Sequence, residues 1–327
     1  MLNVSLFVWI TIGERSFLRE RPPSPSKRLV TQRGMCVSAD MTHPVHVIGA
    51  SGRSGLALCR SLLGDGVPVV AVVRNPAKWA ASGLAGVVRQ ADLRARDGLR
   101  HALAGATRIV SCAHARHTPA IIASAPAEAS LVLLGSTRKF TRWPDAHGNG
   151  VLSGEAALLG SGRTGVMLHP TMIYGAQGED NVQRLAGLLR RLPVLPLPGG
   201  GRFLVQPIHQ TDVTRCIRAA LAYRWQGPNA LVIAGPEPLR YADFVRAVSA
   251  AAGLRRPFIL PFPAAPLILA ARLTKHVRTL PTIQPNEIRR LLEDKAFDVG
   301  PMRDLLHIEP VGLATGLALT FARSSDG

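Results

Sequence analysis

The chain has 327 residues, of which 47% are hydrophobic and 18% are charged. This balance is typical of a globular protein and excludes a wholly disordered chain, which would contain fewer apolar and more charged residues. The formal charge of +18 raises the question of nucleic-acid binding. Most of that charge comes from scattered arginines without interleaved aromatic residues, so we predict no nucleic-acid partner.

Residues 1–43 differ in composition from the rest of the chain. The apolar run at residues 2–12 is too short to span a bilayer, and a charged, proline-bearing tract follows it. We interpret residues 1–43 as a disordered extension, with a targeting or membrane-touching role as the alternative. A second apolar stretch, residues 258–273, contains Pro261, Pro263 and Pro266. These prolines favour a buried or partner-facing segment over a membrane span.

From Val45 onward, short apolar strands alternate with helical segments. The pattern predicts strands within residues 45–48, 67–73, 86–90, 107–113, 130–136 and 165–170, and helices near residues 55–63, 77, 99–103, 119–124 and 152–159. Continuous rather than alternating apolar runs indicate strands that are buried on both faces, as in a parallel sheet covered by helices. The sequence therefore predicts an α/β fold with a Rossmann-type, doubly wound parallel sheet.

The junction between the first strand and the first helix reads "VIGASGRSG" and places Gly49, Gly52 and Gly55 at a spacing of three. Glycines at this junction permit a tight turn, a close approach of backbone to a pyrophosphate, and close packing of helix on strand. The N-terminus of the helix adds unpaired N–H groups that attract phosphate. The junction thus predicts a dinucleotide site; a turn used only for packing is the alternative.

Basic residues at the end of the second strand indicate which dinucleotide binds. An acidic residue there would hydrogen-bond a ribose 2′-hydroxyl, but this chain has Arg74, with Arg53 in the glycine loop and Lys78 close behind. Guanidinium groups match a phosphate in charge and geometry, so NADP is favoured and NAD remains possible. A solvent-facing Arg74 is the alternative. Asp92, after the third strand, is assigned either to the adenine amino group or to capping the next helix.

The segments "VIGASGRSG", "VVRNPAK", "LVLLGSTR", "LHPTMIYG" and "PIHQTDVTRC" together resemble the extended and atypical short-chain dehydrogenase/reductase superfamily, in its NAD-dependent epimerase/dehydratase branch. The resemblance extends from residue 45 to the C-terminus. It implies an NAD(P)-binding Rossmann core over residues 44–175. Residues 176–327 would hold the remaining Rossmann elements, interleaved with a smaller C-terminal region that binds a substrate or a partner. The expected cofactor-binding residues are Gly49, Ser51, Gly52, Arg53, Gly55, Arg74, Asp92 and Ala113.

The sequence departs from the superfamily at the catalytic positions. Members that transfer hydride carry Ser or Thr after the fifth strand and Tyr-x-x-x-Lys on the next helix, where the phenol exchanges a proton with the substrate. Ser136 and Thr137 supply the hydroxyl groups, but the dyad positions fall on His147 and Val151, or on Val151 and Glu155. His147 is a candidate acid or base, although "DAHGNG" indicates a polar loop. Glu155 is expected to be structural.

Other residues take their expected roles from the resemblance. Tyr174 matches a tyrosine beside the nicotinamide or substrate, with a packing aromatic as the alternative. Lys139 is the only lysine near the expected centre, and its neighbours Arg138 and Arg142 are expected to form a basic rim. His169 replaces an arginine that is common in the family. His209 is expected to face the cleft, and Asp212 to cap a helix.

Two functions remain open at this point. The first is an NADP-dependent oxidoreductase or epimerase-like enzyme, with Ser136 and Thr137 polarising a substrate oxygen and His147, Tyr174 or water moving the proton. The second is a non-catalytic NADP(H)-binding sensor or accessory protein. We expect a small-molecule substrate or a protein partner, no metal site and a cytoplasmic location. The sequence leaves the substrate and the oligomeric state open.

Overall fold

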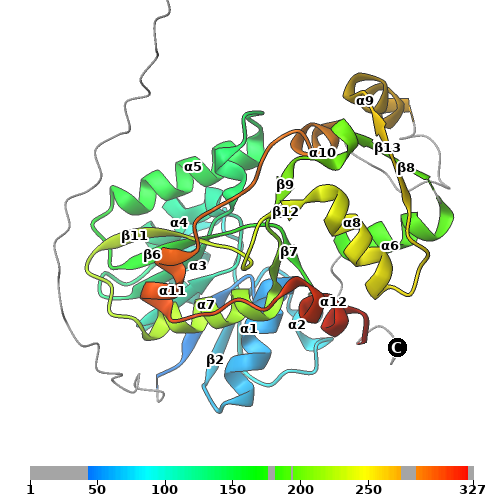
Figure 1. Cartoon of the computed structure of the whole chain (residues 1–327). Coiled ribbons are helices and arrows are strands. Elements are labelled where there is room, and N and C mark those ends of the chain that lie inside the picture. The colour runs from blue at the N-terminus through cyan, green and yellow to red at the C-terminus, as the bar shows by residue number, and fades with distance from the viewer. Residues whose placement is uncertain (1–42, 176–180, 193, 274–284, 323–327) are drawn as a thin grey trace, which may run out of the picture. The chain divides into compact units, whose positions relative to one another are not determined.

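The computed structural model describes residues 43–175, 181–192, 194–273 and 285–322 (Figure 1). In this part of the chain, a seven-stranded parallel sheet has the order β3–β2–β1–β4–β5–β6–β11. Its strands are β1 (Val45–Ile48), β2 (Val69–Val73), β3 (Val87–Gln90), β4 (Arg108–Ser111), β5 (Ser130–Leu134), β6 (Gly165–Pro170) and β11 (Pro228–Ile233). The strand order runs outward from β1 in both directions, so the doubly wound Rossmann-type fold is confirmed.

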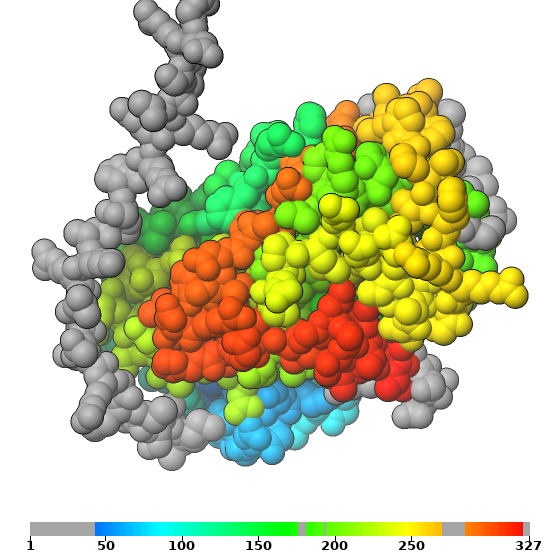
Figure 2. All heavy atoms as spheres, viewed as in Figure 1, coloured from blue at the N-terminus to red at the C-terminus, as the bar shows by residue number. Residues whose placement is uncertain are grey.

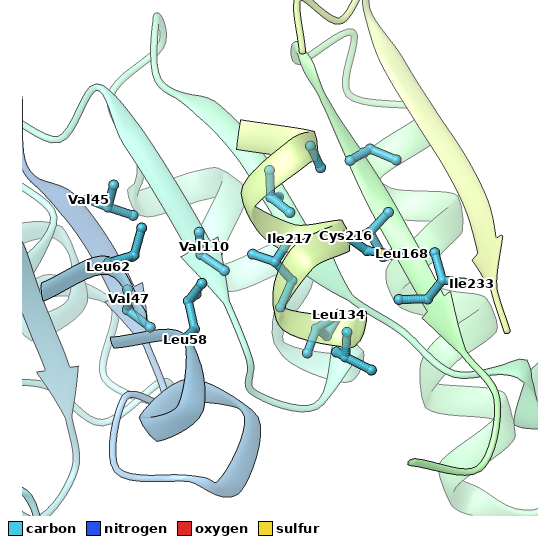
Figure 3. Packing of buried hydrophobic residues seen from close by; sticks show 14 of the residues in the cluster. Val45, Val47, Leu58, Leu62, Val110, Leu134, Leu168, Cys216, Ile217 and Ile233 are labelled. Atoms are coloured by element: carbon cyan, nitrogen blue, oxygen red, sulfur yellow. The ribbon is translucent and has the colours of Figure 1, made fainter. Parts of the chain in front are cut away.

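Helices cover both faces of this sheet because alternate strand residues point to opposite sides. One face packs against α1 (Arg53–Gly64), α7 (Gln210–Ala222) and α11 (Gly300–Leu306), together with Trp79 of α2 (Pro76–Ala80). The other face packs against α3 (Arg96–Ala102), α4 (Thr118–Ser124) and α5 (Ala146–Leu159). Figure 3 shows Cys216 and Ile217 of α7 packed among apolar side chains of the strands. These two buried clusters hold the sheet in place, and the candidate site lies at the carboxyl ends of its strands.

The strand predicted at residues 86–90 forms as β3, but it is not buried on both faces. Val87 is 59% exposed and Val88 is 40% exposed. The reason is topological, since β3 pairs only with β2 and is the last strand on its side of the sheet. The apolar run therefore predicted the strand correctly and its burial wrongly.

The stretch "DAHGNG", predicted as a polar loop, is helical from Ala146 onward. The carboxylate of Asp145 caps α5 by accepting the N–H of Gly148 at 2.8 Å. Gly150 serves close packing: a Cβ there would lie 2.9 Å from the ring of His114 and 3.1 Å from the Cβ of Arg116, in the short 3-10 helix Ala115–His117. A glycine predicted to lie in a loop is thus a contact point between α5 and the segment after β4.

A smaller group of elements follows the sixth strand of the sheet. It contains α6 (Asn181–Arg191), α8 (Tyr241–Ala251), α9 (Ala264–Leu273), α10 (Pro285–Arg290) and α12 (Leu313–Ala322), the parallel pair β8 (Val194–Pro198) and β13 (Phe258–Phe262), and the short strands β7 (Ile173–Tyr174), β9 (Leu204–Val205), β10 (Ile208–His209) and β12 (Leu239–Arg240). Figure 2 shows the red C-terminal residues of α12 against the yellow segment that includes α8. Two apolar clusters hold this region together.

The chain crosses between the two groups of elements more than once. Strand β11 and helices α7 and α11, all from the second half of the chain, belong to the large sheet and its covering layer. The apolar stretch at residues 258–273 forms β13 and α9, with Pro263 between them. No helix within the described ranges is long and apolar enough to cross a membrane.

Candidate active site

The glycine loop lies at the carboxyl end of β1, beside the carboxyl end of β4. Gly49 has φ +76°, a left-handed conformation that favours glycine. A Cβ at Gly49 would lie 3.3 Å from the backbone nitrogen of Ala113, and one at Gly55 would collide with the carbonyl oxygen of Gly49. Gly49 and Gly55 are therefore required for the turn and for the packing of α1 on β1.

The first turn of α1 has the features of an anion site. Gly52 stands at its N-cap, where no side chain caps the helix, and the first turn contains no acidic residue. Uncapped N–H groups and the positive end of the helix dipole favour a phosphate at this position. The Gly52 N–H donates to the carbonyl of Gly49 at 2.9 Å, which closes the loop beneath the helix. These residues fit a dinucleotide diphosphate.

A basic side chain lies at the carboxyl end of β2, at the same end of the sheet as the glycine loop. Arg74 is exposed, and within the described residues its guanidinium has no hydrogen-bond or ion-pair partner. Its neighbour Asn75 is committed to capping α2, because its side-chain oxygen accepts the N–H of Ala77 at 3.0 Å. Arg74 is therefore the residue at this strand end that could bind a 2′-phosphate.

Asp92 is exposed and does not cap α3. Its carboxylate accepts the N–H of Arg94 at 2.9 Å in a turn, whereas the N-cap residue of α3 is Ala95. The capping alternative is therefore wrong. A contact of Asp92 with adenine stays a prediction.

The hydroxyl residues predicted after β5 line a cavity of about 620 Å³. Thr137 donates its hydroxyl to the carbonyl of Pro170 at 3.2 Å, so its proton is used within the protein. The Ser136 hydroxyl oxygen accepts the N–H of Arg138 at 3.2 Å, and its own proton has no protein partner in the described structure. Thr171, after β6, also lines the cavity, and its buried hydroxyl is unpaired. Of the two predicted hydroxyls, Ser136 is thus the better donor to a ligand.

His147 lies in the first turn of α5, lines the cavity and packs edge to face against His114, with ring centroids 4.3 Å apart. The His114 Nδ1 accepts the N–H of Arg116 at 3.1 Å, which places the proton on Nε2. The Nε2 of His114 and the Nδ1 of His147 are buried and unpaired. Burial lowers the pKa of His114 to about 4, and burial together with Arg138 lowers the pKa of His147. Both rings are therefore neutral near pH 7.

His114 was not among the residues predicted from sequence. Its position directly after β4 was the available signal, because ligand-binding residues of such sheets follow the carboxyl ends of strands. Its unpaired Nε2–H and the unpaired Nδ1 of His147 are complementary in hydrogen-bonding capacity.

Tyr174 does not reach the cavity and is a packing residue. Its side chain is 1% exposed and belongs to an apolar cluster with α6, α8 and α12. A Cβ at Gly316 of α12 would collide with the Tyr174 hydroxyl, and the ring packs against His209. Burial and the nearby Asp212 raise the pKa of the phenol above its ordinary value. The prediction of a catalytic Tyr174 is therefore dropped in favour of the packing alternative.

The histidine and aspartate of "H-x-x-D" do not have their expected roles. His209 is 3% exposed and caps α7, because its Nδ1 accepts the N–H of Thr211 at 3.3 Å. The fully buried Asp212 instead accepts the N–H of Val311 at 2.8 Å and pairs with Arg215. Asp212 thus ties the C-terminal segment to α7.

Lys139, the lysine near the expected centre, is buried in a charge cluster. Its Nζ lies 2.6 Å from both carboxylate oxygens of Glu155, and the side chains are 10% and 14% exposed. The Nε2 of His169 lies 3.3 Å from the same carboxylate, and its Nδ1 accepts the N–H of Ser136 at 3.2 Å. Burial and the charge of Lys139 lower the pKa of His169 to about 4, so the neutral ring orients Ser136.

The fold and the cofactor class agree with known proteins. Residues 49–140 match a family model described as NAD(P)H-binding. Among solved structures, the UDP-glucuronic acid 4-epimerase of Bacillus cereus, in complex with UDP-glucuronic acid and NAD, matches with a TM-score of 0.66 and 15% identity over 87% of this chain and 99% of that chain. The NADPH-dependent quinone oxidoreductase of Escherichia coli, complexed with NADPH, matches with a TM-score of 0.66 and 20% identity over 85% of this chain and 99% of that chain.

No curated protein matches the sequence. At these identities the solved structures show the shared fold, and the family model shows the NAD(P)-binding domain. The predictions of an NAD(P) cofactor and of a Rossmann-type fold are thereby confirmed.

Proposed function

We propose that this chain, whose residues 49–140 form an NAD(P)-binding domain, is an NADP-dependent oxidoreductase that reduces a carbonyl group in the cavity beside Ser136. One observation supports this most directly. Hydrogen-bonding groups without protein partners, which lie after β5, after β6 and on α5, line one cavity. Like the uncapped glycine loop, they lie beyond the carboxyl ends of the strands. In open α/β sheets, ligands bind at this end of the strands.

The residues take the following roles in the proposed reaction. The first turn of α1 holds the diphosphate, and Arg74 binds the 2′-phosphate. Bound NADPH supplies the hydride that goes to the carbonyl carbon. Ser136 donates its hydroxyl proton, and His147 its Nε2–H, as hydrogen bonds to the carbonyl oxygen; a neutral imidazole can polarise a carbonyl in this way. The carbonyl oxygen takes up a proton along one of these hydrogen bonds, and the side chain that donated the proton regains one from solvent.

A non-catalytic NADP(H) binder is the second candidate. It is favoured by the residues of α5 at the Tyr-x-x-x-Lys positions. Val151 is 1% exposed and packed in the core, and α5 contains no tyrosine or lysine. The loss of NADPH absorbance with a panel of aldehydes, ketones and quinones separates the candidates. Consumption of NADPH supports the reductase, whereas tight NADPH binding with no consumption across the panel supports the binder.

Arg74→Asp is expected to weaken NADPH binding about 10- to 100-fold and NADH binding less than threefold. The reason is that charge-assisted hydrogen bonds to a phosphate contribute about 1.5–3 kcal/mol, and NADH has no 2′-phosphate. Both affinities are measured by calorimetry. Arg224→Asp, the same charge change at an exposed residue after α7, should leave both affinities unchanged. Equal losses for the two nucleotides in Arg74→Asp would rule out the 2′-phosphate contact.

His147→Gln is expected to lower kcat roughly 10- to 100-fold without changing the Kd of NADPH. The amide still donates a hydrogen bond, but it cannot match the orientation of the ring. Since the pKa of His147 lies below its ordinary value, the neutral form persists from pH 8 down to about 6.5, and wild-type kcat should fall only at lower pH. His101→Gln, at an exposed site on α3, is the control. An unchanged kcat in His147→Gln would remove His147 from the site.

A further inference from the structure

The cavity has two walls of different chemistry. The large sheet and α5 contribute Ser136, His147 and Thr171, whose hydrogen-bonding groups are described above. The smaller region contributes a wall of apolar side chains from α6, β8, α8 and α10, namely Leu185, Leu188, Leu195, Leu197, Phe244 and Ile288. A volume of about 620 Å³ is sufficient for a drug-sized ligand.

Most polar side chains in the apolar wall are already bonded within the protein. Gln206 donates its side-chain N–H to the carbonyl of Gly235 at 2.8 Å and accepts the N–H of Phe297 at 2.7 Å. The cations that line the cavity are also paired: Arg184 lies 3.1 Å from Glu287, Lys295 lies 3.6 Å from Glu293, and Arg138 and Arg290 both pair with Asp145. The Tyr241 hydroxyl is the exception, because no partner for it is found in the described residues.

This distribution disfavours a nucleotide sugar as the ligand of the cavity. A uracil, a ribose and a hexose would each bury hydroxyl or amide groups that need partners, and a buried polar group without one costs about 1–3 kcal/mol. Ligand specificity in such sites comes from polar groups placed for the ligand. Apart from the Tyr241 hydroxyl, the unpaired groups of the cavity lie near Ser136, and the two lone pairs of one carbonyl oxygen can accept from Ser136 and His147.

We propose that the substrate is a lipophilic carbonyl compound, a ketone or quinone with a hydrocarbon chain. Its carbonyl oxygen accepts hydrogen bonds from Ser136 and His147, and its chain lies along Leu185 and Leu188 of α6 and Leu197 of β8. The inference rests on the proposed reductase function for the reaction, but it specifies a ligand class that can be tested by binding alone. Burial of the apolar wall and of the ligand's hydrocarbon chain away from water provides the free energy of binding.

The test is calorimetric titration of the full chain, saturated with NADP⁺ so that no ketone is reduced during the titration, with a series of 2-alkanones from six to twelve carbons and with UDP-glucose. Each methylene that enters the cavity should tighten binding about fourfold, as expected from burial of one methylene, until the chain fills the cavity. UDP-glucose should bind more weakly than the longest ketones. An affinity independent of chain length, or tighter binding of UDP-glucose, would overturn the proposal.

This readout separates the two proposals. Chain-length-dependent binding without NADPH consumption would contradict the reductase and support the ligand class. Consumption of NADPH with short carbonyl compounds, without any gain from a longer chain, would support the reductase and overturn the ligand class.

A variant that shortens the cavity provides an independent check. Leu188→Trp places a larger side chain on the α6 wall, so ketones of ten or more carbons should bind at least tenfold more weakly while the six-carbon ketone stays within about threefold of wild type. Leu319→Trp, at an exposed position of α12 outside the cavity lining, is the matched control. Equal effects of Leu188→Trp on short and long ketones would place the chain elsewhere. If this variant does not fold, the wild-type series still decides.

Discussion

Gly52→Asp is expected to weaken NADPH binding about 1,000-fold. The substitution puts a carboxylate at the N-cap of α1, where its negative charge would face the diphosphate, and like charges brought together in a binding site cost several kcal/mol. The carboxylate would also accept the first-turn N–H groups that the diphosphate needs. The affinities of wild type and variant are compared by calorimetry with NADPH.

The fold should survive this change, which makes the result interpretable. Gly52 has φ −82° and ψ 167°, an extended conformation that any residue adopts, and aspartate is a preferred N-cap. A Cβ there would lie 3.1 Å from the carbonyl oxygen of Gly49, a contact that needs a small adjustment. Gly52→Asn serves as the control, because it adds a side chain of the same size without charge. If Gly52→Asp binds NADPH as tightly as wild type, the diphosphate is not at this helix.

The sheet and the glycine loop were predictable because short-range patterns encode them. Uninterrupted apolar runs such as Val69–Val73 signal strands buried on both faces, and the spacing of Gly49 and Gly55 marks the turn between β1 and α1. Each of these features depends on residues within one strand–turn–helix unit. For the same reason the exposure of β3 was not predictable, since it depends on which strand lies at the sheet edge.

The candidate site was only partly predictable because tertiary contacts decide which side chains reach the cavity. Ser136 and His147 were identified from their places in the chain, and both line the cavity. Tyr174 was misassigned because α12, distant in sequence, covers it. The pairing of Lys139 with Glu155 joins two elements through space, and no local pattern indicates it.

Glu155→Ala is expected to lower the free energy of unfolding by about 3–5 kcal/mol, the usual cost of leaving one member of a buried ion pair without its partner. Lys139 is only 10% exposed on its side chain, so water cannot readily replace the lost carboxylate. The measurement is urea unfolding followed by circular dichroism. Glu155→Gln, which keeps the shape and one acceptor oxygen, should cost less than the alanine variant.

The paired substitution Lys139→Met with Glu155→Leu distinguishes an uncompensated charge from a lost packing contact. Replacing both charges by apolar side chains of similar size is often neutral or stabilising, so the double variant should be at least 2 kcal/mol more stable than Glu155→Ala. If the double variant and Glu155→Ala lose the same free energy of unfolding, packing and not charge stabilises the cluster. Because His169 contacts Glu155 through Nε2 and orients Ser136 through Nδ1, the double variant should also lower kcat while the Kd of NADPH stays the same. The cluster would then act on the reaction only by positioning Ser136.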